Sequence, residues 1–149
     1  MSLQKELMTK LKEAMKSKDA VALESLRAVK SAILLAQTES GAKEELTEDQ
    51  ELKILQKLVK QRKDSAILFT EQGREDLAAP ELAQAEVISQ FLPEQMDEES
   101  IKAVVVDIIA QTGAEGMKDM GKVMGMASKQ LAGKADGKAI SVIVKASLV

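Results

Sequence analysis

The stretch TEDQELKILQKLVKQRKDSAILF, residues 47–69, has the hydrophobic period of a long α-helix. Its apolar residues recur every three or four positions and so share one helix face. They are Leu52, Leu55, Leu58, Val59, Ala66 and Phe69. Thr47 and Gln50 have the spacing of a capping box, which predicts a helix start, and Gly73 is a typical helix stop. We therefore expect one helix between Thr47 and Gly73.

The same helical period continues on both sides of this stretch and predicts six further helices. The first is expected from Ser2 to Ser17, and the second is capped by Asp19 and stops at Ser40-Gly41. After the helix that stops at Gly73, the next begins between Asp76 and Pro80 and ends at Pro93. Two helices that stop at Gly113 and at Gly133 follow, and Asp136 caps the last helix. Pro80 is expected in a first turn, where proline is tolerated. The sequence thus predicts an all-α protein.

A boundary is expected near residue 95, in the segment Leu92-Pro93-Glu94-Gln95-Met96. The acidic residues Asp97-Glu98-Glu99 that follow are typical of a new helix N-terminus. We predict two domains: a helical hairpin or bundle of about four helices in residues 1–95, and a small three-helix domain in residues 96–149.

The composition excludes several classes of chemistry. The 149 residues include no cysteine and no histidine, which removes disulfides, thiolate nucleophiles, cysteine-based zinc sites and histidine-dependent triads. Glu81 and Glu86 lie five positions apart, so they do not project from one helix face as a catalytic pair. We therefore predict no catalytic residue, no metal site and no cofactor.

The N-terminal residues indicate where the protein is located, and the aromatic content limits which ligands it can bind. Met1 to Leu11 alternate apolar with charged residues, unlike a signal peptide, and no apolar run is long enough for a membrane span. A cytoplasmic location is expected. With two phenylalanines and no tyrosine or tryptophan, a platform on which single-stranded bases stack is disfavoured.

Glycines and lysines alternate near the C-terminus. Gly121 and Gly125 lie four apart on a predicted helix, where each costs about 1 kcal/mol relative to alanine, and Ser128 extends the same face. Close packing of another helix, the commoner case, or close approach of a ligand such as a phosphate would compensate. On the same helix, Met120 and Met124 are expected in the core, with Met126 free to sit outside it.

Charge is uneven along the chain. Residues 113–149 contain six lysines and three acids, a net charge of +3, which leaves −6 on residues 1–112. This basic tail fits either a polyanion partner or a solvated surface. A second stripe, Lys53, Lys57 and Lys60, is expected to be a solvent face paired with Glu51 and Asp64. Glu24 and Arg27 are expected, partly buried, in structural ion pairs across the bundle.

Several segments resemble the YqeY family over essentially the whole chain. They are Glu24-Ser25-Leu26-Arg27, Lys60-Gln61-Arg62-Lys63-Asp64-Ser65, Gly73-Arg74-Glu75-Asp76-Leu77, Leu92-Pro93, Lys118-Asp119-Met120-Gly121-Lys122-Val123-Met124-Gly125, Gly133-Lys134-Ala135-Asp136-Gly137 and Val144-Lys145. The resemblance implies a three-helix C-terminal part that is shared with the tail of the GatB subunit of tRNA-dependent amidotransferases, which are carbon-nitrogen ligases with glutamine as amido donor. That tail contacts tRNA and lacks the catalytic centre.

Carried onto this sequence, the resemblance implies tRNA contacts at Lys118, Lys122, Lys129, Lys134 and Lys138, with Gly121 and Gly125 permitting close approach. The leading hypothesis is a tRNA-binding module that is not catalytic alone. The alternative is a protein-interaction adaptor that docks on an amidotransferase or aminoacyl-tRNA synthetase through the methionine-bearing face of its C-terminal helices. Independent enzymatic activity is the least favoured.

Overall fold

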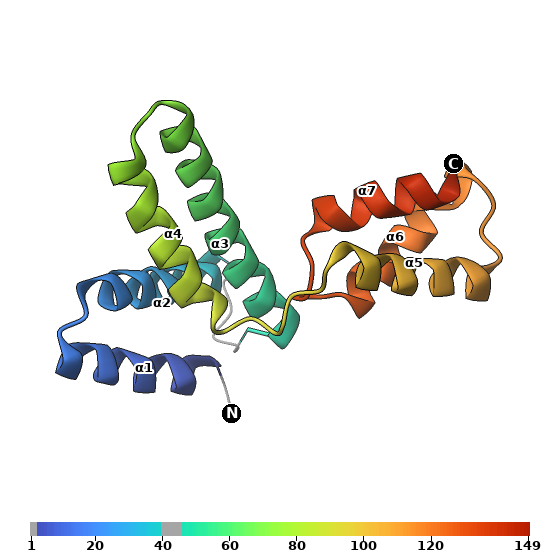
Figure 1. Cartoon of the computed structure of the whole chain (residues 1–149). Helices are drawn as coiled ribbons and strands as arrows, with labels where there is room; N and C mark the ends of the chain where they lie inside the picture. The colour runs from blue at the N-terminus through green and yellow to red at the C-terminus, as the bar shows by residue number, and fades with distance from the viewer. Residues whose placement is uncertain (1–2, 40–45) are drawn as a thin grey trace. The chain divides into compact units, whose positions relative to one another are not determined.

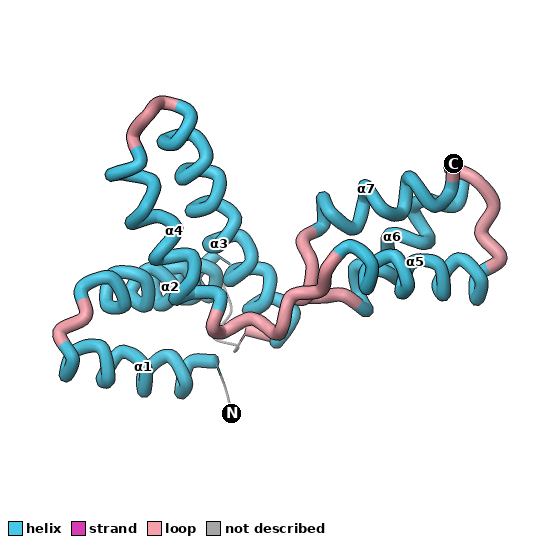
Figure 2. Tube along the Cα trace, in the orientation of Figure 1, coloured by secondary structure: helices cyan, strands magenta, loops and turns pink. Residues whose placement is uncertain are grey.

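The helices of the chain are bounded by the residues that cap them. The computed structural model describes residues 3–39 and 46–149, which contain no strand (Figures 1 and 2). The elements are α1 (Leu3–Ser17), α2 (Ala20–Glu39), α3 (Glu48–Glu71), α4 (Glu75–Ser89), α5 (Glu98–Thr112), the 3-10 helix η1 (Met117–Asp119), α6 (Met120–Gln130) and α7 (Gly137–Leu148). The all-α prediction is confirmed.

Residue contacts divide the chain into two compact units, Met1–Leu92 and Pro93–Val149. Each unit buries its own apolar cluster, and within the described residues the two clusters have no member in common. The stop expected at Ser40-Gly41 lies outside those residues. Whether 1–95 and 96–149 fold as independent domains stays a prediction.

In the first unit, α3 and α4 form a helical hairpin, α4 also packs on α2, and α2 packs on α1 (Figure 1). The core contains Leu7, Val29, Leu55 and Ile88, each at most 3% exposed. The capping box at the start of α3 is present: the Gln50 N–H donates to Thr47 Oγ1 at 3.2 Å, and the Thr47 N–H donates to Gln50 Oε1 at 2.9 Å. The predicted start of this helix is therefore confirmed.

The limits of α4 differ from those predicted. The helix begins at Glu75, because Gly73 ends α3 with φ +71° and the Arg74 carbonyl accepts the N–H groups of Leu77 and Ala78. Pro80 therefore lies inside the helix instead of in its first turn, on an exposed face where water can satisfy the carbonyl that lacks a helical donor. The helix ends at Ser89, before Pro93, and Phe91 and Leu92 continue in a turn.

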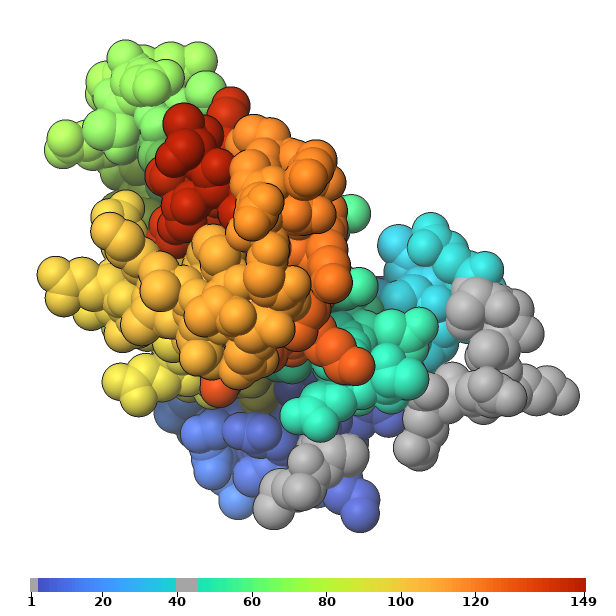
Figure 3. All heavy atoms as spheres, turned by 90° about the vertical axis from the view of Figure 1, so that its right-hand side faces the viewer, coloured from blue at the N-terminus to red at the C-terminus, as the bar shows by residue number. Residues whose placement is uncertain are grey.

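In the second unit, α5, α6 and α7 surround a core that includes Val105, Ile108, Val123 and Val144, none of them measurably exposed. Figure 3 shows the face on which these helices, amber to red, reach the surface. Three predicted signals are confirmed here. The carboxylates of Asp97 and Asp136 accept the N–H groups of Ser100 at 2.8 Å and Ala139 at 2.7 Å, and Gly113 ends α5 with φ +65°.

Candidate nucleic-acid interface

The outer face of α6 carries two lysines with a glycine between them. Val123 and Ala127 are fully buried against α5 and α7. Lys122, Gly125 and Lys129, spaced by three and four positions, share the opposite face, and all three are exposed. The two lysines lie about 10 Å apart along the helix axis, at 1.5 Å per residue. The helix thus presents a small residue flanked by cations to the solvent.

The two glycines of α6 face open space. No atom lies within 4 Å of the position that a Cβ would occupy at Gly121 or Gly125, leaving out the helix's own backbone and the adjoining residues, and both glycines are exposed. The expectation that another helix packs closely on this face is therefore wrong within the described residues. The neighbouring helices pack on the opposite side, where Ala127 supplies the small contact residue. The glycine face is left available to something outside the unit.

The five predicted lysines are distributed over four parts of the unit. Lys122 and Lys129 lie on α6, Lys118 lies in η1, Lys134 lies in the turn after α6, and Lys138 is the second residue of α7. All five are exposed, and the ion pairs seen among the described residues, Lys10–Glu13 and Arg74–Asp76, involve none of them. The structure therefore brings Lys122 and Lys129 onto one face and places the others beyond the ends of α6.

The acid closest in sequence to these lysines is engaged elsewhere. Asp119 is half-buried, and its Oδ2 accepts the backbone N–H of Glu115 at 2.8 Å in the loop before η1. This hydrogen bond closes the segment 115–119, which contains Gly116 at positive φ. The carboxylate therefore shapes the approach to α6 and does not pair with a lysine.

The turn between α6 and α7 is held by the segment that precedes α5. The Gln95 side-chain amide donates to the Gly133 carbonyl at 2.7 Å, and the Met96 N–H donates to the Lys134 carbonyl at 2.9 Å. Gly133 is buried and has φ +76°. These two bonds fix the backbone from which the Lys134 side chain extends. Sequence reasoning missed Gln95, because its partner lies 38 positions away and no local pattern signals it.

A family comparison agrees with the extent of this fold. A sequence model of the family described as "Yqey-like protein" matches residues 4–148. The chain belongs to the YqeY family. A relative is "Altered inheritance of mitochondria protein 41, mitochondrial" of Clavispora lusitaniae (strain ATCC 42720), which is 39% identical over 92 residues. The match covers 60% of this chain and 52% of that protein, so the chain spans about half the length of the relative.

Two YqeY-like segments of the first unit have structural roles. Arg74 donates from Nε and Nη2 to the two carboxylate oxygens of Asp76, each at 3.0 Å, where α3 turns into α4. This interaction lowers the pKa of the Asp76 carboxyl below its ordinary value. Arg62 donates from Nε to Gln84 Oε1 on α4 at 3.1 Å and from Nη1 to the Leu58 carbonyl at 3.1 Å. Arg62 therefore links α3 to α4, whereas the Arg74–Asp76 pair is a local contact at the start of α4.

One predicted ionic arrangement in this YqeY chain, and part of a second, is not seen among the described residues. Glu24 and Arg27 are exposed on α2 and make no ion pair there, so the prediction of buried structural pairs is wrong. Lys53, Lys57 and Lys60 are exposed on α3 as expected, but the pairing expected with Asp64 is not seen. Both differences follow from the weak attraction between exposed charges in water.

The methionines of α6 lie at the edge of the core. Met120, Met124 and Met126 are all half-buried and pack against the apolar cluster of the second unit, so the two methionines expected in the core are only partly enclosed and Met126 is enclosed to a similar degree. Flexible methionine side chains can bend back onto a core from the edge of a helix face. Met117 in η1 is 45% exposed.

Two further properties of this YqeY chain bear on its function. Across residues 3–39 and 46–149, no three carboxylates lie close enough together to hold a metal ion. None of the helices in that part of the chain has the length and apolarity that a membrane crossing needs. The cytoplasmic location stays a prediction.

Proposed function

We propose that the C-terminal unit of this YqeY protein is a tRNA-binding module, non-catalytic alone, that contacts the phosphate backbone through the outer face of α6. The observation that carries the proposal is the arrangement Lys122–Gly125–Lys129. The glycine has no neighbouring atom on its open side, and both lysines are exposed. Structured RNA is recognised largely through its shape, phosphates and 2′-hydroxyl groups, which suits a surface without aromatic side chains.

Glycine at position 125 supports this proposal on energetic grounds. Glycine inside a helix costs about 1 kcal/mol relative to alanine. Within the unit, no neighbouring atom lies where a side chain at position 125 would be, so internal packing does not explain the glycine. A partner surface that must approach α6 closely would explain it. Lysines on either side would neutralise phosphates and release counterions, which makes the affinity dependent on salt.

Lys118, Lys134 and Lys138 extend the proposed surface beyond the two ends of α6. The relationship to the amidotransferase GatB subunit, and through it to glutamine-dependent carbon-nitrogen ligases, is part of the same proposal and describes descent. Docking on an amidotransferase or synthetase is the alternative, and a complex that survives ribonuclease treatment would favour it.

The experiment measures the affinity of the full chain for bulk tRNA and for an RNA duplex of equal length, at low and at physiological salt. We expect the chain to bind tRNA more tightly than the duplex. The logarithm of the affinity should fall linearly with the logarithm of the salt concentration, with a slope of about 0.7 to 0.9 for each phosphate that the protein neutralises. Lys122→Gln with Lys129→Gln should weaken binding about tenfold and reduce that slope by about 1.5 to 2.

The matched control is Lys53→Gln with Lys57→Gln, which removes the same charge from exposed lysines of α3. An equal loss of affinity in the control would assign the binding to net charge instead of α6. No tRNA binding at low salt would reject the module and favour the adaptor.

A further inference from the structure

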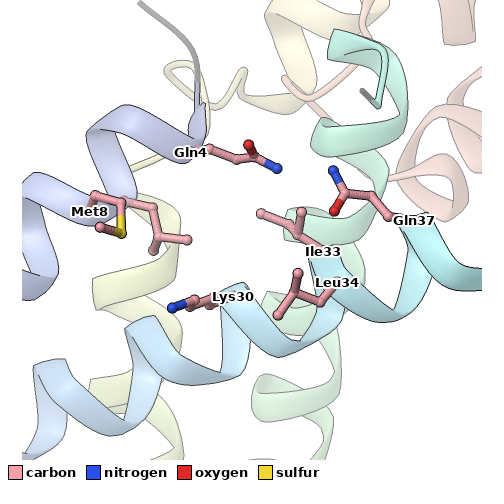
Figure 4. A pocket seen from close by; sticks show the side chains of 7 residues that line it. Gln4, Met8, Lys30, Ile33, Leu34 and Gln37 are labelled. Carbon is pink, nitrogen blue, oxygen red and sulfur yellow. The ribbon is translucent and has the colours of Figure 1, made fainter. Parts of the chain in front are cut away.

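A groove runs between α1 and α2 in the first unit. Its volume is about 280 Å³, and it is lined by Gln4, Leu7, Met8, Lys30, Ile33, Leu34 and Gln37 (Figure 4). Leu7 and Ile33 are buried and form the floor, whereas Met8 is 48% and Leu34 51% exposed. The groove therefore presents apolar surface that the described part of the unit leaves open to solvent.

A further exposed apolar side chain lies on the same face of α1 beyond the groove, with Lys12 between it and Met8. Met15 lies seven positions after Met8, so it shares the same helix face, and it is 55% exposed. The two methionines are about 10 Å apart along the axis. This length matches the distance between anchors at positions i and i+7 of a docked helix. Methionine side chains adapt their shape to such anchors.

The charge at the groove is net positive. Among the described residues that line it, Lys30 carries the charge. By helical spacing, Lys12 follows Met8 by four positions and Arg27 precedes Lys30 by three, so these two exposed cations extend the same side. Exposed Glu24, three positions before Arg27, is the one carboxylate that the same spacing adds on α2. Glu13 of α1 pairs with Lys10 at 3.9 Å, and both of these residues line a different hollow, together with Val87 and Gln90 near the end of α4. A basic rim thus borders the apolar strip on a chain that is acidic overall.

We propose that the groove between α1 and α2 docks an acidic amphipathic helix of a partner protein. Its apolar residues would fill the strip between Met8 and Leu34, and carboxylates on its flanks would meet Lys12, Arg27 and Lys30. Helix-in-groove recognition needs an apolar channel with complementary charges on its rim, and both are present here. The site is separate from α6 and does not depend on the proposed RNA binding.

The test is a selection of displayed peptides on the full chain. Each peptide is a helix of about 18 residues, or roughly five turns, with leucines at i, i+3, i+4 and i+7 and with glutamate or lysine varied at the flanking positions. We expect peptides with acidic flanks to be enriched about tenfold over those with basic flanks, because each rim pair contributes modestly. Lys30→Glu should reduce this preference several-fold, because Lys12 and Arg27 remain, and Leu34→Glu should remove the enrichment.

Leu35→Glu is the matched control. Leu35 is 60% exposed and adjoins Leu34 but does not line the groove, so this variant should retain the acidic peptides. Enrichment of basic flanks, no enrichment at all, or equal loss in Leu34→Glu and Leu35→Glu would overturn the proposal. Vesicles containing phosphatidylserine and bulk tRNA serve as competitors. Displacement of the peptides by vesicles, with vesicle binding lost in Leu34→Glu, would assign the groove to a membrane surface instead.

Discussion

The side-chain amide of Gln95 donates a 2.7 Å hydrogen bond to the main-chain carbonyl of Gly133, across 38 residues of sequence. The same amide donates to the Pro93 carbonyl at 2.9 Å. One side chain therefore ties the start of the second unit to the turn between α6 and α7, whose glycine is buried at positive φ. The orientation of α6 relative to α7, and with it the position of Lys134, depends on this contact.

Replacement of Gln95 by alanine should destabilise the second unit by about 1 kcal/mol, because the Gly133 carbonyl loses its donor in a partly buried site. Amide hydrogen exchange of α5 and α7 would measure the change within that unit. Gln61→Ala on an exposed position of α3 is the control and should leave exchange in α7 unaltered. Equal exchange in both variants would show that the turn is held by other contacts.

Replacement of Gly125 by alanine should stabilise the protein by about 1 kcal/mol, because the added methyl group meets no atom and the helix propensity improves. Gly113→Ala should destabilise it by about 1 kcal/mol or more, because Gly113 has φ +65°. Urea unfolding followed by circular dichroism would give both values. Destabilisation by Gly125→Ala would reveal a close contact on the outer face of α6 and contradict its open character.

The same Gly125 variants separate stability from binding. If tRNA approaches α6 closely, Gly125→Leu should weaken binding about tenfold more than Gly125→Ala, because the longer side chain projects into the contact between Lys122 and Lys129. Both variants keep every lysine, so their net charge is that of the parent. Equal affinities for tRNA would place the RNA contact away from this face.

Acid should weaken the cap of α5. The Ser100 backbone N–H donates to the Asp97 carboxylate, which lowers the pKa of Asp97 in the folded protein below its ordinary value of 3.8. Because the pKa of Asp97 is lower in the folded than in the unfolded protein, this group stabilises the fold at any pH above its unfolded pKa. That stabilisation is lost as the pH falls through the pKa of the folded state. Stability should therefore decline below about pH 4 through this group.

Asp97→Asn isolates this effect, because asparagine also caps helices but does not titrate. The variant should resemble the parent near neutral pH and show a shallower decline in acid, measured by urea unfolding at a series of pH values. Glu99→Gln, which removes a neighbouring exposed charge, is the control and should keep the parent's decline. Parallel curves for Asp97→Asn and the parent would contradict the assignment.

Residues 93–149 should fold as a separate fragment, because their buried cluster shares no member with that of the first unit among the described residues. We expect a helical circular dichroism spectrum and a cooperative thermal transition, with the protected amides of α5 and α7 matching those of the full chain. A fragment of this size has a small core, so its stability should be modest. A disordered fragment would show that the first unit is required for folding.

The helices were predictable wherever the signal is local. The cap pairs Thr47 with Gln50 and Asp97 with Ser100 lie within one turn, and the apolar period identified buried positions such as Leu55 and Ala66. Pro80 was misplaced, because α4 starts directly after the Gly73 turn, where the Arg74 carbonyl accepts the N–H groups of Leu77 and Ala78, and the proline therefore falls inside the helix.

The candidate interface was predictable only as a set of residue types. The sequence identified Lys122, Lys129 and Gly125 as candidates, but whether the glycine face packs inward depends on α5 and α7, which sequence periodicity does not orient. The groove between α1 and α2 was missed for the same reason. Met8 and Leu34 have ordinary helical spacing, and the opening between them depends on how two helices diverge.

The half-buried methionines of α6 make this protein's response to peroxide a probe of its fold. With no cysteine in the chain, oxidation falls on thioethers, each of which becomes a polar sulfoxide. Exposed Met8, Met15 and Met117 should react first, with little structural effect. Conversion of Met120, Met124 and Met126 would then place polar sulfoxides against Val123 and Ala127 and loosen α6 from its neighbours. The order in which sulfoxides appear would therefore report how tightly the proposed RNA-binding helix is held.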